Sequence, residues 1–94
     1  MSEPRKNDRP AFTAQLGLIS VGVWKKVITD NDGKPRAYYD TSVKRSYKKD
    51  DGTYSTTTTM GDRDLGNAIA LQQAAQQFII SDLAAFADSV RNAA

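Results

Sequence analysis

The chain has 94 residues, of which 39% are hydrophobic and 26% are charged, a composition typical of one small globular domain. It contains no cysteine and no histidine, which excludes disulfides, thiol nucleophiles and imidazole acid–base or metal chemistry. Composition therefore argues against an enzyme, a metal or cofactor site and a small-molecule substrate. The net charge is only +2, but 11 of the 13 basic side chains fall within residues 1–60, so positive charge is concentrated in that part of the chain.

The start of the chain is polar and lacks the hydrophobic run of a signal peptide. We expect residues 1–10 to form a disordered arm in front of a single domain over residues 11–94. No segment approaches the roughly 20 apolar residues that span a bilayer. With no cysteine to protect, these features predict a cytoplasmic protein without a membrane partner.

Alternation of apolar and polar residues, the period of a β-strand, runs through residues 12–28, with Ile19, Val21 and Val23 on one face. This run is far longer than a usual strand of about 5 to 6 residues. We therefore expect a bend or bulge near Gly17 or Gly22 to divide it.

Two turn signals separate the next strands. Residues 30–33 read Asp-Asn-Asp-Gly and residues 50–52 read Asp-Asp-Gly, and the runs over 36–49 and 53–60 are again typical of strands. The first turn has a faint likeness to a calcium loop, but the ligand spacing of an EF-hand is absent, and a hairpin turn explains it. The sequence thus predicts a twisted antiparallel β-meander of three to four strands.

From Asp64 onward the apolar residues recur every three or four positions, which predicts a long C-terminal helix. Asp62 or Asp64 is a suitable N-cap residue. A helix over residues 65–93 would be about 43 Å long, against a diameter of roughly 32 Å for a compact domain of this size. We therefore expect the helix to kink near Ser81, to break or to project from an α+β fold.

Apolar side chains are also in surplus on this helix between Phe78 and Val90. A domain this small buries only about two-thirds of its unfolded surface, so a partner subunit would help to stabilise it. We expect a homodimer formed at least partly through the C-terminal helix.

Aromatic and basic residues are interleaved along the predicted strands. If Ile19, Val21 and Val23 face the helix, strand alternation turns Trp24 and Lys26 to the opposite face, while Arg45 and Tyr47 fall on the helix side. Aromatic rings stack on unpaired bases and cations hold phosphates. The candidate binding residues are Trp24, Lys26, Arg36, Tyr38, Lys44, Lys48 and Tyr54.

This arrangement predicts sequence-tolerant binding of single-stranded nucleic acid, with DNA favoured over RNA. Two alternatives use the same residues. Aromatics are common in strands and lysines protect exposed edges, so the pattern is also that of an ordinary sheet. A non-enzymatic protein-interaction or assembly module would dock a polypeptide on the same rings or on an edge strand.

The order of these elements resembles the single-stranded-DNA-binding coactivator fold group, the positive-cofactor-four family and its Whirly relatives. The matching pieces are the first long strand with Val21, Gly22, Val23 and Trp24, the two Asp-Gly turns, the strand holding Lys44 and Arg45, and the helix from Leu65. The segment Arg45-Ser46-Tyr47-Lys48 also resembles small uncharacterised bacterial proteins. The resemblance implies a DNA-binding sheet and helix-mediated dimerisation.

Overall fold

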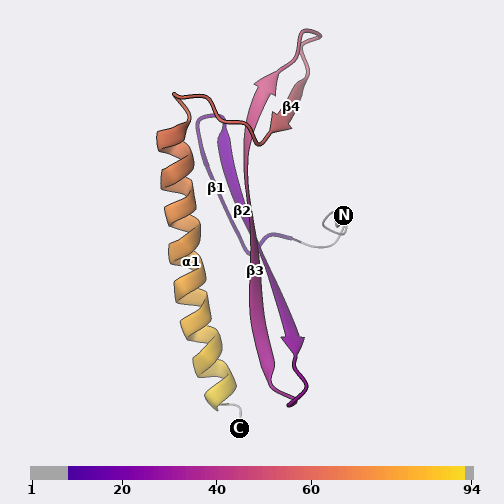
Figure 1. Ribbon diagram of the computed structural model, residues 1–94, viewed down its shortest axis with the longest axis vertical. Coiled ribbons are helices and arrows are strands. Elements are labelled where there is room, and N and C mark those ends of the chain that lie inside the picture. The colour runs from indigo at the N-terminus through magenta and orange to yellow at the C-terminus, as the bar shows by residue number, and fades with distance from the viewer. Residues whose placement is uncertain (1–8, 93–94) are drawn as a thin grey trace.

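The computed structural model describes residues 9–92, so the arm predicted over residues 1–10 lies almost wholly outside the described residues. The structure has a four-stranded antiparallel sheet followed by one long helix, which confirms the α+β fold. Figure 1 shows the helix lying along one side of the sheet. The elements are β1 (Phe12–Leu16), β2 (Ile19–Thr29), β3 (Pro35–Lys48), β4 (Tyr54–Thr57) and α1 (Leu65–Asn92).

The long first run of alternating residues is divided at Gly17, as predicted, but by a complete chain reversal. Gly17 has φ of 59°, a left-handed conformation in which a side chain would be strained. A tight turn over Gly17 and Leu18 joins β1 to β2, and Leu16 lies opposite Ile19. The first run therefore supplies two antiparallel strands rather than one bent strand.

The strands follow one another as a meander in the order β1-β2-β3-β4. The turns that join β2 to β3 and β3 to β4 contain Gly33 and Gly52, both with positive φ, as the Asp-Gly signals predict. In the first of these turns Asp30 accepts hydrogen bonds from the backbone N–H groups of Asp32 and Lys34, at 2.9 Å each. The Asp30 carboxylate thus stabilises a hairpin turn.

The core lies between α1 and the sheet. Apolar side chains from alternate positions of β2 meet small and apolar residues spaced three and four apart on the helix. Phe12 of β1 stacks on Phe78 of α1, with ring centroids 5.1 Å apart. Among the described residues, the buried set is Ile19, Val21, Val23, Ala68, Leu71 and Ala75.

Helix α1 is continuous from Leu65 to Asn92, so the expected kink near Ser81 does not occur. Asp82, the residue after Ser81, points to the sheet and pairs with Lys25. The expectation of a kink assumed a compact domain, whereas the molecule extends 56 × 27 × 17 Å. Its Cα radius of gyration is 16.5 Å, against about 12 Å for a compact domain of this length.

Strand β4 is shorter than the predicted run over residues 53–60. The chain leaves the sheet after Thr57, whose hydroxyl accepts a hydrogen bond from the backbone N–H of Thr59. Arg45 then holds this connection by donating to the carbonyl of Thr59 at 3.1 Å. Local side-chain bonding of threonine therefore ends the strand where β-propensity alone would extend it.

No helix among residues 9–92 is long and apolar enough to cross a membrane.

Candidate functional site

All seven candidate binding residues lie on one face of the sheet. In β2 and β3 the odd-numbered residues of the core and its surroundings face α1, and the even-numbered residues face away from it. The pairing of β3 with β4 carries the same alternation to Tyr54. We call the face turned away from the helix the open face, and it holds Trp24, Lys26, Arg36, Tyr38, Lys44, Lys48 and Tyr54.

The register of the strands brings aromatic and basic residues together in two places. Lys26 lies directly opposite Tyr38, and Lys48 lies directly opposite Tyr54. Side chains of directly opposed residues are neighbours on a sheet, with Cβ atoms about 5 Å apart. Each end of the open face therefore has a ring beside an ammonium group, with Lys44 between them.

The two places are far apart along β3. Arg36 and Lys48 are twelve residues apart, which corresponds to roughly 40 Å of strand. The seven residues therefore form a long track rather than one compact pocket. A track of this kind suits an extended polymer better than a small ligand.

Exposure differs among the aromatic residues of the open face. Tyr54 is 66% exposed and Tyr38 is 52% exposed, so both present ring surface to solvent. Trp24 is half-buried, because its indole lies across the bare backbone of Gly22. Its Nε1 is buried without a hydrogen-bond partner among the described residues. Trp24 therefore lies on the predicted face but presents only part of its ring to solvent.

Arg36 is engaged within its own hairpin. Its Nε lies 2.7 Å from a carboxylate oxygen of Asp30. This contact lowers the pKa of Asp30, with help from the backbone N–H of Lys34, and raises the pKa of Arg36. Within residues 9–92, no ion pair engages the three lysines of the open face, Lys26, Lys44 and Lys48.

One acidic residue also lies on the open face. Asp40 is exposed and lies directly opposite Trp24, between the two ring-and-ammonium pairs. The alternation of β3 alone places it there. The lysines of the open face still outnumber it, so the face is basic.

Arg45 and Tyr47 lie on the helix side, as predicted. The Nε of Arg45 is 3.4 Å from a carboxylate oxygen of Asp64, the residue just before α1. Arg45 thus ties β3 to the start of the helix. Tyr47 is 37% exposed near the turn that leads to β4.

A cluster of charged and polar side chains that was not predicted from the sequence joins β2 and β3 to the second half of α1. The carboxylate of Asp82 in α1 lies 2.8 Å from the ammonium of Lys25 and accepts a hydrogen bond from the hydroxyl of Tyr39. Lys25 also lies 5.0 Å from the ring centre of Phe86. Lys25 and Asp82 are 57 positions apart, so no local pattern in the sequence indicates the contact.

The described residues contain no group of three or more acidic, histidine or cysteine side chains placed to hold a metal ion. Comparison with models of known protein families gave no match, and neither did comparison with curated proteins or with solved structures. The resemblance to the coactivator fold group thus rests on the order of the elements and on the residue pattern, and stays a prediction.

Proposed function

We propose that this protein binds single-stranded nucleic acid along the open face of the sheet, with DNA preferred over RNA. The observation that supports the proposal is the pairing of Tyr38 with Lys26 and of Tyr54 with Lys48 on one basic face. Unpaired bases stack on such rings and their phosphates contact the neighbouring ammonium groups.

The roles within the track follow from exposure and pairing. Tyr38 and Tyr54 stack bases, and Lys26, Lys44 and Lys48 contact phosphates. Trp24 contributes the exposed part of its ring next to Lys26 on the same strand. Arg36 is an auxiliary contact, because Asp30 already neutralises part of its charge.

Fluorescence anisotropy with a labelled oligonucleotide and its duplex tests the proposal. Each phosphate contact with a single strand contributes about −0.7 to the slope of log affinity against log salt, so three lysines predict a slope near −2. The double change Lys44→Ala with Lys48→Ala should reduce the magnitude of that slope by about 1.4. Arg63→Ala, which removes an exposed cation just before α1, is the control and should leave the slope unchanged.

Absence of binding to any single strand at about 50 mM salt, where the electrostatic contribution is strong, would reject the nucleic-acid proposal. A protein-interaction module would then be the better reading of the same surface. A duplex bound as tightly as the single strand would also reject it, because paired bases cannot stack on tyrosine rings.

We also propose that the protein is a homodimer and that α1 takes part in the interface. Six residues make up the buried core of the described chain, while Leu65, Ile69, Ile80 and Leu83 of α1 remain exposed. A core this small is marginal for a chain of this length. Sedimentation equilibrium at micromolar concentration should give about twice the 10.3 kDa of one chain.

A further inference from the structure

Strand β3 has a long free edge. It pairs with β2 over Pro35–Arg45, but on its other side it pairs with β4 only from Arg45 to Lys48. From Pro35 to Lys44, no strand of the described chain pairs with the outer side of β3. We call residues 35–44 of β3 the free edge.

The backbone groups of the free edge point outward at alternate residues. The N–H of Ser46 donates toward β2, to Leu18, whereas the N–H of Lys49 donates to Thr53 on the β4 side. Even-numbered residues of β3 therefore turn their backbone groups to β2, and odd-numbered residues turn theirs outward. The outward set is Ala37, Tyr39, Thr41 and Val43, with the carbonyl of Pro35.

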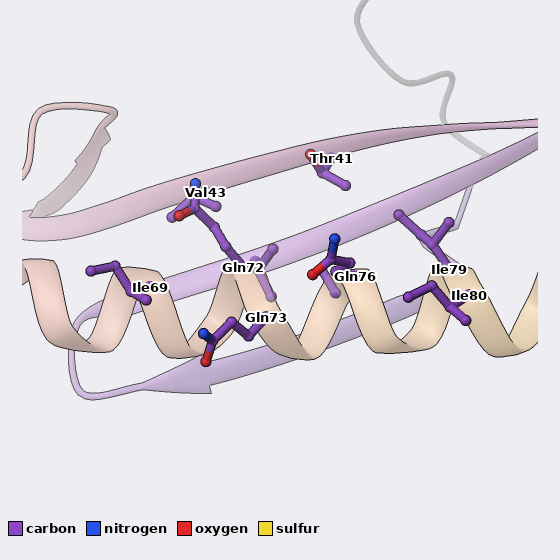
Figure 2. Close-up of a pocket in the computed structure, with 10 residues that line it drawn as sticks. Thr41, Val43, Ile69, Gln72, Gln73, Gln76, Ile79 and Ile80 are labelled. Atoms are coloured by element: carbon purple, nitrogen blue, oxygen red, sulfur yellow. The ribbon is translucent and has the colours of Figure 1, made fainter.

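Proteins usually protect such an edge with charged side chains, a proline, a bulge, a short strand or a covering segment. The charged side chains of this edge, Arg36, Asp40 and Lys44, lie on the open face and leave the side toward the helix uncharged. The free edge has an unbroken register with β2 and no bulge, and its only proline is the first residue of the strand. On the side that faces α1, the free edge borders a groove of about 580 Å³, and Thr41 and Val43 form part of its floor. Figure 2 shows the other wall of this groove, formed by side chains of α1 that include Ile69 and Ile80.

We propose that the free edges of two copies pair with each other, antiparallel, so that the two sheets join into one. This inference rests on the proposed homodimer and locates its interface. A two-fold axis perpendicular to the sheet keeps both helices on one side and both open faces on the other. The two grooves then merge between the helices.

Sterics and charge favour a register centred on Tyr38 over one centred on Asp40. The β2–β3 turn of one copy must stop short of β4 in the other, which joins β3 at Arg45. Placing Tyr38 opposite Tyr38 of the partner subunit meets this condition, and it sets Arg36 opposite Asp40 at two equivalent positions. A register centred on Asp40 would instead oppose two carboxylates and set Arg36 against Lys44.

The same register selects the part of α1 that meets the second copy. Tyr39 hydrogen-bonds to Asp82, so the axis through Tyr38 passes near Asp82 of the helix. Sheet twist makes the two helices cross, which confines their contact to the region near the axis. Ile80 and Leu83 flank Asp82 and belong to this region, whereas Ile69 is 13 residues away from Asp82, or about 20 Å along the helix.

A second copy fits this edge better than an unrelated peptide does. The backbone pairing covers few residues, whereas a stable interface buries about 1,200–2,000 Å² in total. The α1 helix of a second copy supplies the additional apolar surface. In each copy this is the helix whose side chains line the groove. The joined sheet also brings two Tyr38 rings together at the centre of one continuous open face.

Single cysteines test the register, because the chain has none of its own. Tyr38→Cys should form a disulfide-linked dimer under mild oxidation, since opposed residues of this kind have Cα atoms about 4.5 Å apart, within disulfide range. Tyr54→Cys, on the open face but remote from the axis, is the control and should remain monomeric on a denaturing gel. Equal linkage of both variants, or linkage of neither in a protein that sediments as a dimer, would overturn the edge pairing while leaving the dimer intact.

Two isoleucines of α1 with the same exposure provide the second test. Ile80 is 54% exposed and Ile69 is 53% exposed. Ile80→Asp should weaken the dimer at least tenfold in sedimentation equilibrium, and Ile69→Asp should leave it unchanged. Equal weakening by both would indicate a dimer built along the whole helix and would overturn the inference. A monomeric parent protein would overturn both the dimer and the edge pairing.

Discussion

The ammonium of Lys25 lies 2.8 Å from the carboxylate of Asp82, joining the middle of β2 to the second half of α1. Tyr39 of β3 donates its hydroxyl to the same carboxylate. The two contacts lower the pKa of Asp82, with Lys25 the larger cause. This cluster holds the helix against the sheet beyond Ala75, the last buried residue of α1 in the described chain.

We predict that Asp82→Asn lowers the free energy of unfolding by about 1 to 2 kcal/mol, because it removes a charge-assisted hydrogen bond and a partly exposed ion pair. Urea denaturation followed by circular dichroism measures the change. Asp88→Asn is a matched control on the same helix, since within residues 9–92 the one ion pair of Asp88 is with Arg91, at an exposed position. Equal losses in the two variants would show that the cluster does not anchor α1.

Tyr39 should titrate at unusually high pH. Burial raises its pKa to about 12, and the hydrogen bond to Asp82 acts in the same direction. The difference in tyrosinate absorbance between the parent and Tyr39→Phe isolates this one ring, and its midpoint should lie near 12. Asp82→Asn should lower that midpoint, because the neighbouring carboxylate is gone.

These shifts also predict how stability depends on pH. The pKa of Tyr39 is higher in the folded chain than its ordinary value of 10.0, so its contribution is present below pH 10 and is lost as pH rises toward 12. The pKa of Asp82 is lower in the folded chain, so its contribution is present above the ordinary carboxyl pKa and is lost as pH falls. Tyr39→Phe should therefore flatten the alkaline decline of stability. An unchanged decline would contradict the assignment.

Alternation and turn residues are local properties, which is why the strands and the α+β fold could be predicted from the sequence. Gly17 shows the limit of that reading. A glycine inside an alternating run indicates a break, but whether the chain bends or reverses depends on how the flanking residues pair. The helix illustrates a second limit, since its straight course past Ser81 follows from an elongated shape that only tertiary contacts determine.

Gly22 leaves room for the indole of Trp24. A Cβ at Gly22 would lie 2.7 Å from Cη2 of the Trp24 ring and 3.0 Å from Cζ3. We predict that Gly22→Ala displaces the indole into water, shifts the fluorescence of the only tryptophan to longer wavelength and costs about 1 to 2 kcal/mol of stability.

Gly66→Ala is the control for that substitution. A Cβ at Gly66 meets nothing within 4 Å, and alanine favours a helix over glycine by up to about 1 kcal/mol. The variant should keep the parent emission spectrum and gain stability. An unshifted spectrum in Gly22→Ala would mean that the ring does not rest on Gly22.

The sequence predicted which face of the sheet carries the candidate site, but not how each of its side chains is buried or paired. Strand alternation alone places Tyr38, Lys44 and Lys48 together, because residues two apart share a side of the sheet. The half-burial of Trp24 depends on the absence of a side chain at Gly22, which alternation does not reveal. The pairing of Arg36 with Asp30 depends on how the hairpin turn folds back, and the sequence shows only that both residues flank it.

Tyr54 and Tyr47 offer the sharpest comparison for the proposed function, because they lie on the two strands of one hairpin but on opposite faces of the sheet. Tyr54→Ala should weaken binding of a single-stranded oligonucleotide by about 1 to 3 kcal/mol, the contribution of one stacked base. The salt slope should not change, since no cation is removed. Tyr47→Ala removes a ring of the same size from the helix side and should leave the affinity within about twofold of the parent, a difference worth roughly 0.4 kcal/mol. Anisotropy titrations at two salt concentrations measure both quantities, and circular dichroism establishes that each variant is folded. If Tyr47→Ala weakened binding as much as Tyr54→Ala, the ligand would not lie on the open face, because a single strand stacked there cannot contact a ring on the opposite side of the sheet.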